Sequence, residues 1–433
     1  MKYALVTHGQ KREPIGKQLI LNVGDYMQWV AIENLYRYMN LDKEDIVELS
    51  TEDFSTYRGE KLVLPINYMW AEFNYCQYVT ENHVAFSDDI IPVFLGISFK
   101  RGGWEWTKEW IEYFKRYEPI GCRDYATYEK LNELGIAAYL AGCLTATLPI
   151  KERVTGDVTY FVEAPKALEK YVPNELKEKS KFIKHQMVVT EEDFYSQASG
   201  MKKSKKYLDE YCKDAKLVVT SRLHCALPCM ALGIPVILVK EYFGYPFDLQ
   251  RKFLPFYSYN DFKNIEWYPE SVDLERYKII ALECAKKRLL GEDADHEIAE
   301  LHAEYAQLYK DEYVEEKMGL DIFIDKMEKL HSEKDRFDYA LWGLSDNAER
   351  IFSYMKEHYP KARLVKAIDN QKEIGFHGIN SEPINVLRAE DDFLTIVTTI
   401  NVSVDAVPFF DKIGKKENQY ICVTDGIMEH TQG

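Results

Sequence analysis

The residues best suited to chemistry stand in the stretch TSRLHCALPCMALGIP at residues 220–235. Arg222 and His224 come directly after the apolar run KLVV at residues 216–219. An arginine can hold a phosphate or a carboxylate through two parallel hydrogen bonds, and a histidine can carry or release a proton near neutral pH. The pair therefore indicates an anion site with a proton donor. The residues alone also fit a second interpretation, a local hydrogen-bonding pair in a turn.

The helix that follows this pair is bounded by glycine and proline. Gly233 occupies the position expected of a helix C-cap, and Pro235 prevents the helix from continuing. We therefore expect the helix to end near Leu232. Pro228 has no N–H and is tolerated only in the first turn of a helix, which places the helix start near Cys225.

These bounds put Arg222 and His224 in the turn between a strand and a helix, at the carboxyl edge of the sheet. Open α/β sheets bind their ligands at this edge. The free N–H groups of the helix N-terminus and the positive end of its dipole favour an anion at the same place.

Two other stretches have a similar layout. NVGD at residues 22–25 starts a helix predicted over 22–39, where Gly24 permits close backbone approach and Asp25 can cap the helix or act as a base. Arg123 ends a short strand ahead of another helix, which suits an anion site and equally suits a surface pair with the next residue, an aspartate.

Two further pieces carry weaker signals. The loop at residues 7–18 holds the basic residues His8, Lys11, Arg12 and Lys17, which fit either an anion pocket or a solvated loop. WGLSDNAE at residues 342–349 has a single glycine where dinucleotide binding needs G-x-G-x-x-G, so we expect no nicotinamide cofactor.

Apolar runs alternate with amphipathic stretches along most of the chain, which predicts α/β units with parallel sheets. Strands are predicted at 3–7, 61–67, 90–98, 119–124, 137–142, 157–163, 181–189, 216–220 and 235–239, and helices at 22–39, 106–117, 126–135, 198–213 and 225–232. Residues 270–335 are mostly helical and highly charged, and a polar linker at 331–338 precedes a β–α–β rhythm. The predicted domains are 1–152, 153–330 with the trailing helices, and a small accessory α/β domain at 337–433.

The composition limits the classes of function. A net charge of −16 over 433 residues predicts a surface that repels nucleic acid and anionic membranes. No window approaches about eighteen consecutive apolar residues, and the first residues lack the apolar core of a signal peptide. The eight cysteines are scattered, and no histidine cluster accompanies Cys225 and Cys229. We expect a cytoplasmic protein with reduced thiols, no metal site and no transmembrane segment.

These pieces together resemble the polysaccharide pyruvyl transferase family over most of residues 1–310. The resemblance rests on NVGDYMQ (22–28), PVFLGIS (92–98), CRDYATYEKLNELGI (122–136), AGCLTATL (141–148) and above all AKLVVTSRLHCALPCMALGIPVILV (215–239). It implies two Rossmann-like domains in a GT-B-like arrangement around a central cleft. The unit at 337–433 lies outside it and resembles Rossmann-like domains attached to other polysaccharide-biosynthesis proteins.

The resemblance also implies a reaction. Family members transfer the enolpyruvyl group of phosphoenolpyruvate onto two sugar hydroxyls and form a cyclic ketal. The family's Arg-x-His corresponds to Arg222 and His224, and its second binding arginine to Arg123. Phosphoenolpyruvate would be a co-substrate, with no other cofactor, and a sugar or lipid-linked precursor of an exopolysaccharide would be the acceptor. Asn22, Gly24, Leu223 and Cys225 are the remaining predicted substrate-binding residues.

Chemistry assigns roles to these residues. Two arginines and a helix N-terminus match the carboxylate and the phosphate of phosphoenolpyruvate. His224 as imidazolium would protonate the methylene carbon, and Asp25 would deprotonate or orient a hydroxyl. The stretch LPINYMWAEF at 64–73 departs from the Gly-rich turn that the family often has there, so the acceptor side can differ.

Two alternatives stay open. One is a GT-B glycosyltransferase that uses a nucleotide sugar, with Arg222 on its diphosphate. The other is a non-enzymatic binding protein. The sequence leaves the acceptor sugar, peripheral contact with a membrane and the oligomeric state undetermined.

Overall fold

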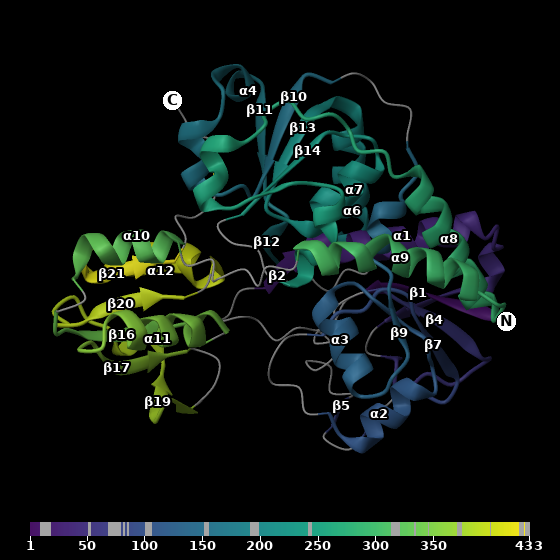
Figure 1. Cartoon of the computed structure of the whole chain (residues 1–433), viewed down its shortest axis with the longest axis horizontal. Coiled ribbons are helices and arrows are strands. Elements are labelled where there is room, and N and C mark those ends of the chain that lie inside the picture. The colour runs from purple at the N-terminus through teal and green to yellow at the C-terminus, as the bar shows by residue number, and fades with distance from the viewer. Residues whose placement is uncertain are drawn as a thin grey trace.

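The computed structural model describes residues 1–8, 19–50, 53–67, 79–80, 83–84, 86–99, 106–150, 156–190, 199–240, 245–312, 321–332, 335–344, 346–369, 375–398, 400–423 and 428. The fold is mixed α/β, with three largely parallel sheets that lie in separate regions of the molecule (Figure 1). The predicted α/β class with parallel sheets is confirmed.

The first sheet has the order β3 (Ile46–Ser50), β1 (Lys2–His8), β4 (Leu62–Ile66) and β7 (Ile90–Phe94), all parallel. A parallel bridge from Ile97 to Cys122 adds β8 (Ile120–Cys122) and β9 (Ala138–Leu140). The helices of this unit are α1 (Val23–Tyr38), α2 (Lys108–Lys115) and α3 (Tyr125–Glu133), and β5 (Val79–Thr80) pairs with β6 (His83–Val84). Arg123 stands at the carboxyl end of β8.

The second sheet has the order β11 (Ser180–Ile183), β10 (Val158–Val162), β13 (Ala215–Thr220), β14 (Val236–Val239) and β15 (Phe256–Tyr257), again all parallel. Its helices include α4 (Asn174–Glu178), α6 (Ser199–Asp214) and α7 (Leu223–Ala231). The chain leaves β10 toward β11 on one side, while β13 lies on the other. The strand order therefore reverses between β10 and β13, which is the place where open α/β sheets bind ligands.

The predicted single strand over 181–189 is wrong, because this segment forms two strands in different sheets. β11 ends at Ile183, and β12 (Gln186–Val189) pairs antiparallel with β2 (Leu19–Asn22) of the first unit. Gln186 lies opposite Asn22 in this two-stranded ribbon. The ribbon joins the two α/β units directly beside the first turn of α1.

Helices α8 (Glu275–Leu290) and α9 (Asp295–Glu312) follow the second sheet in sequence but pack against the first unit. Tyr277 donates its hydroxyl to the Ala141 carbonyl over 3.1 Å, and the ring Nδ1 of His302 accepts from the Leu140 N–H over 3.2 Å. In Figure 1, α1, α8 and α9 run between the first and the second sheet. Together with α6 and α7, which contact α1, they close one core over both units.

The third sheet has the order β18 (Gly375–Phe376), β19 (Ile379–Glu382), β17 (Arg363–Ile368), β16 (Asp338–Trp342), β20 (Leu394–Val397) and β21 (Tyr420–Cys422). Only the β18–β19 pair is antiparallel. Helices α10 (Asp321–Leu330), α11 (Asp346–His358) and α12 (Ile400–Ile413) belong to this unit. Beyond it, the buried Met428 donates its N–H to the Ala164 carbonyl of the second unit over 2.8 Å.

Candidate active site

Arg222 lies where the sequence predicts it, in the turn between β13 and α7. It is the N-cap residue of α7, with extended backbone angles of φ −105° and ψ 124°. Its Nε donates to Oε2 of Glu163, and its Nη2 donates to Oε1 of Gln186 over 3.0 Å. The side chain remains 28% exposed, whereas the Glu163 side chain is only 4% exposed. One edge of the guanidinium is thus held by the protein, and the group still reaches the surface.

The helix α7 starts two residues before its predicted position, and Pro228 explains the irregular backbone in its first turn. The helix spans Leu223–Ala231 instead of starting near Cys225, but His224 inside it is not helical, at φ −82° and ψ 21°. Pro228 has no N–H to donate to the carbonyl four residues earlier, which belongs to His224. At the other end, Leu232 is the C-cap residue, and Gly233 follows it in the left-handed conformation at φ +74°, so the predicted end of the helix near Leu232 is confirmed.

The side chain of Cys225, a predicted substrate-binding residue, does not reach the surface of the site. Its side chain is fully buried in the core, and its N–H donates to the Arg222 carbonyl over 3.1 Å. The Ala226 N–H uses the same carbonyl over 3.0 Å. Leu223 is also buried, at 8% exposure. Among the described residues, none accepts from the N–H of Leu223 or His224, so these two backbone donors remain for an anion.

Arg123 is not part of a surface pair with Asp124. It is 2% exposed, and Asp124 turns away to accept from Ser98 and from the Thr127 N–H at 2.8 Å. Burial raises the pKa of the Asp124 carboxyl, and the hydrogen bonds from Ser98 and Thr127 act against that rise. The aspartate is thereby committed to capping α3.

The partners of Arg123 are neutral. Its Nη1 donates to Oε1 of Gln28 over 3.0 Å and lies 3.3 Å from Nε2 of His224. Its Nε is buried and meets no acceptor among the described residues, and none of their carboxylates forms an ion pair with it. The Asp124 carboxylate interacts with this charge only at longer range, and its hydrogen bonds go to Ser98 and Thr127. A buried guanidinium without an ion pair is costly, so this position favours the arrival of an anion.

The contact between Arg123 and His224 indicates whether Nε2 of the histidine carries a proton. A guanidinium can only donate, so Nε2 of His224 must accept and the ring is neutral. Burial lowers the pKa of His224 well below its usual value, and the charges of Arg123 and His185 lower it further. The unliganded site therefore holds a neutral histidine rather than the imidazolium needed for an acid.

The first turn of α1 meets the same histidine. An added β-carbon at Gly24 would lie 3.3 Å from Cβ of His224 and 3.3 Å from Oδ1 of Asn22. The close backbone approach predicted for Gly24 is thus present. The N-cap of α1 is Asn22 and not Asp25: the Asn22 amide oxygen accepts from the Gly24 N–H over 3.1 Å. Asp25 lies inside the first turn, where Oδ1 accepts from Asn22 Nδ2 over 2.9 Å.

The structure therefore brings six of the predicted residues together, whereas the side chains of Leu223 and Cys225 are buried. Asn22, Gly24 and Asp25 come from the β2–α1 turn, Arg123 from the end of β8, and Arg222 and His224 from the β13–α7 turn. The amino-acid sequence carries signals for three further residues of this site that the prediction missed. Gln28 lies one helical turn after Asp25, Glu163 is a charged residue at the end of an apolar strand, and Gln186 directly precedes the short apolar run of residues 187–189. The basic loop residues Lys11, Arg12 and Lys17 and most of the stretch at 64–73 lie outside the described residues.

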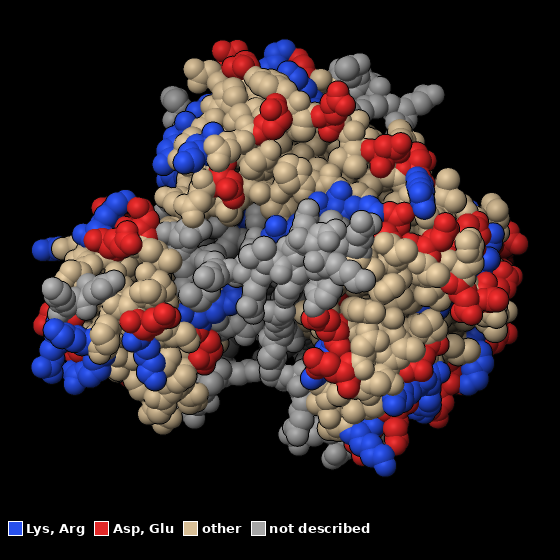
Figure 2. All heavy atoms as spheres, in the orientation of Figure 1, with Lys and Arg blue, Asp and Glu red and all other residues tan. Residues whose placement is uncertain are grey.

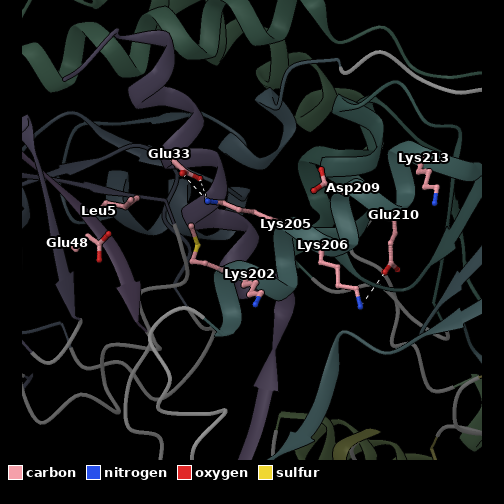
Figure 3. Close-up of a pocket in the computed structure, with 10 residues that line it drawn as sticks. Leu5, Glu33, Glu48, Lys202, Lys205, Lys206, Asp209, Glu210 and Lys213 are labelled. Atoms are coloured by element: carbon pink, nitrogen blue, oxygen red, sulfur yellow. Dashed lines mark hydrogen bonds and ion pairs between the residues drawn. The ribbon is translucent and has the colours of Figure 1, made fainter. Parts of the chain in front are cut away.

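On the face in Figure 2, both acidic and basic side chains of the described residues are spread over the surface. A hollow of about 710 Å³ between α1, β3 and α6 shows the same balance (Figure 3). Four lysines and four acids line it, with Lys205 2.8 Å from Glu33 and Lys206 3.6 Å from Glu210. The predicted site residues are not among those that line this hollow.

The described part of the chain contains neither a metal-binding group nor a helix that could span a membrane. No group of three or more His, Cys, Asp and Glu side chains within it is placed to hold a metal ion. None of its helices combines the length and the apolar character that crossing a bilayer requires.

Comparison with known proteins assigns the chain to a family. The model of the polysaccharide pyruvyl transferase family matches residues 22–241, a little over half of the 433 residues, and this range includes every site residue named above. The chain belongs to the polysaccharide pyruvyl transferase family.

The other comparisons add little. A crystal structure of the functionally uncharacterized protein KP1_0663 from Klebsiella pneumoniae subsp. pneumoniae NTUH-K2044 is similar at 12% identity, over 62% of this chain and 90% of that chain. Its TM-score of 0.32 is too low to support a conclusion about fold or function. No curated protein matches the chain.

Proposed function

We propose that this protein transfers the enolpyruvyl group of phosphoenolpyruvate onto two hydroxyls of a sugar in a cell-surface polysaccharide precursor, and forms a pyruvate ketal. The reaction would take place in the cytoplasm, between two units arranged as in GT-B enzymes. Membership in the pyruvyl transferase family supports the reaction class. The proposal of phosphoenolpyruvate as donor rests on the site.

The observation that carries this proposal is the burial of the Arg123 guanidinium among neutral partners. Its guanidinium is buried beside the neutral groups of Gln28 and His224, with no ion pair to a described carboxylate. Such a group gains most from a ligand that brings negative charge. Arg222 adds a second guanidinium on the neighbouring turn, and the N–H groups of Leu223 and His224 add backbone donors. Phosphoenolpyruvate carries a carboxylate and a phosphate on one carbon, which fits two separate cationic groups.

His224 would act as the acid only after the donor binds. An anion that takes the Nη1 donor of Arg123 releases Nε2 of His224 and offsets the positive charge that lowers the histidine pKa. The ring can then hold a proton and pass it to the methylene carbon of phosphoenolpyruvate, which becomes a methyl group. This step makes the central carbon electrophilic.

The remaining steps balance without a further reagent. One sugar hydroxyl forms a bond to the central carbon and gives up its proton, which restores His224. The C–O bond to phosphate then breaks, and the second hydroxyl closes the ketal while its proton leaves with phosphate. Asp25 would accept a proton from a hydroxyl or orient it, and the 2.9 Å hydrogen bond from Nδ2 of Asn22 would hold its carboxylate in place.

The proposal is tested by incubating the protein with phosphoenolpyruvate and a panel of lipid-linked and nucleotide sugars, and by measuring phosphate release together with the mass of the product. For His224→Gln we expect kcat to fall about 100- to 10,000-fold, since a positioned acid contributes on this scale. Affinity for phosphoenolpyruvate should change only a few-fold, about the worth of one neutral hydrogen bond. His296→Gln, on the exposed surface of α9, is the matched control.

Phosphate release by the wild-type protein that does not exceed release by His224→Gln would contradict the proposal. Thermal-shift scans separate it from the glycosyltransferase alternative. A ligand at a hundredfold excess over Kd should stabilise the protein by about 2.7 kcal/mol. Stabilisation by a uridine or guanosine diphosphate, and none by phosphoenolpyruvate, would favour the glycosyltransferase.

A further inference from the structure

Glu163 occupies an unusual position directly beneath Arg222. It follows the last residue of β10, at the edge where the strand order of the second sheet reverses. Its backbone has φ +49°, which is uncommon for a residue other than glycine. Residues held in this region require support from their surroundings and cluster at functional sites.

The surroundings of Glu163 supply that support from both sides. Its N–H donates to the Ile183 carbonyl over 3.1 Å, and its own carbonyl accepts from Oγ of Ser221 over 2.7 Å. The strained residue is thus fixed between the ends of β11 and β13. This placement turns its carboxylate toward the β13–α7 turn.

Both carboxylate oxygens are engaged by the site. Oε1 accepts from the Gln186 N–H over 2.9 Å, and Oε2 accepts from Nε of Arg222. The Gln186 side chain completes a ring of contacts by accepting from Nη2 of Arg222 over 3.0 Å. Two of the three guanidinium nitrogens are therefore held, and Nη1 has no acceptor among the described residues.

The same contacts reach the opposite side of the site. Gln186 is the residue of β12 that lies opposite Asn22 in the ribbon, and Asn22 holds Asp25. One carboxylate thus orients the arginine of the second unit and anchors the strand that carries the N-terminal site residues.

We propose that Glu163 is a positioning residue, which holds the guanidinium of Arg222 with Nη1 turned outward to bind phosphoenolpyruvate. This inference rests on the proposed function, because it names phosphoenolpyruvate as the anion. A carboxylate is required because it faces two N–H donors. A carboxamide has one oxygen and one NH₂ group, so one donor would face another donor.

The test measures binding of phosphoenolpyruvate to the full chain by isothermal titration calorimetry, for the wild type, Glu163→Gln, Arg222→Lys and the double variant. We expect Glu163→Gln to raise Kd about 10- to 100-fold, the scale of a lost hydrogen bond between charged groups. Glu169→Gln is the matched control, since it removes the same charge from an exposed residue nearby in the sequence. A melting curve for each variant checks that it is folded.

The double variant separates positioning from a general structural role. If Glu163 acts through Arg222, the double variant should bind no more weakly than Arg222→Lys alone. Multiplied losses would contradict the inference, and so would wild-type affinity in a folded Glu163→Gln. If Glu163→Gln does not fold, Glu163→Asp keeps the charge but is too short to reach both donors, and it should give a smaller loss of the same kind. Full affinity of Glu163→Asp would then count against the proposal. A wild-type protein that does not bind phosphoenolpyruvate would overturn the proposed function itself.

Discussion

The two arginines of the site are built in opposite ways. Arg123 is buried at 2% exposure and touches neutral groups, whereas Arg222 is 28% exposed at its side chain and is paired with a carboxylate. Arg123 therefore holds a buried charge that makes no ion pair with a described carboxylate, whereas the charge of Arg222 is paired with Glu163. We expect Arg123 to supply most of the electrostatic stabilisation of an anion that binds both arginines. We expect Arg222 to fix the orientation of that anion.

Among the tests of this comparison, the largest effect should come from removing the charge at each arginine in turn. Arg123→Met should lower phosphoenolpyruvate-dependent turnover about 100- to 1,000-fold, because one preorganised cationic donor is lost. Its free energy of unfolding should stay the same or rise by up to about 2 kcal/mol, since a buried charge without an ion pair disappears. Phosphate release and chemical denaturation measure the two quantities.

Arg222→Met should lower turnover as well but should change stability in the other direction. It leaves the Glu163 carboxylate buried without its cation, which should cost about 1–3 kcal/mol. Arg116→Met, at the exposed end of α2, is a control for loss of an arginine elsewhere. Equal loss of stability in both site variants would remove the distinction between the arginines.

A smaller effect concerns protons. The pKa of His224 is low in the free protein, and an anion on Arg123 should raise it. Binding of phosphoenolpyruvate should then take up a proton, and affinity should weaken as pH rises, by at most about tenfold per pH unit. Calorimetry in buffers of different ionisation enthalpy measures the uptake. The difference between wild type and His224→Gln isolates the histidine from the titration of phosphoenolpyruvate.

The free energy of unfolding of the free protein should depend on pH through the protonation of His224. Above its unfolded pKa, His224 is neutral in both states and contributes no pH dependence. As pH falls below about 6.5, the unfolded chain gains a proton that the folded site does not, so the free energy of unfolding decreases. Wild type should lose more stability than His224→Gln between neutral pH and the folded pKa. Parallel curves for the two proteins would show that the site does not lower this pKa.

The smallest effect is expected for Gly24→Ala, which changes the space beside His224 and leaves the charges of the site unchanged. Alanine favours a helix over glycine by about 1 kcal/mol, yet its β-carbon would lie 3.3 Å from Cβ of His224. Gly24→Ala should therefore leave the melting temperature nearly unchanged. It should lower kcat only a few-fold, through displacement of the histidine ring. A loss as large as that of His224→Gln would mean that Gly24 itself serves the reaction.

Local patterns predicted the elements that carry the site. The buried strands β10 and β13 are continuous apolar runs, and the alternation with amphipathic helices gave the α/β class. Pro228 and Gly233 placed α7 to within two residues at its start, and the shortfall follows from the missing N–H of Pro228. Arg222, His224 and Arg123 could be found because each lies between a predicted strand and a predicted helix, at the sheet edge where ligands bind.

Contacts between distant segments could not be predicted in the same way. β12 pairs with β2 across the two units, and no local feature of residues 181–189 records that partner. The capping of α1 was assigned to Asp25 because Asp and Asn are both strong N-caps, and the extended backbone of Asn22 at the end of β2 decides between them. Cys225 was placed at the site by sequence adjacency, whereas helix geometry turns it into the core.

The contacts of Arg123 have a consequence for the order in which the molecule folds. Its partners Gln28 and His224 lie 95 and 101 residues away in the chain. Contacts this distant close large loops and tend to form late. Each sheet can assemble first while the guanidinium is still hydrated, so the chain strips water from this charge only in the final docking step. We therefore expect the anion-binding centre to be the last part of the molecule to take shape, and a bound anion to slow the separation of the docked units rather than to speed the formation of either sheet.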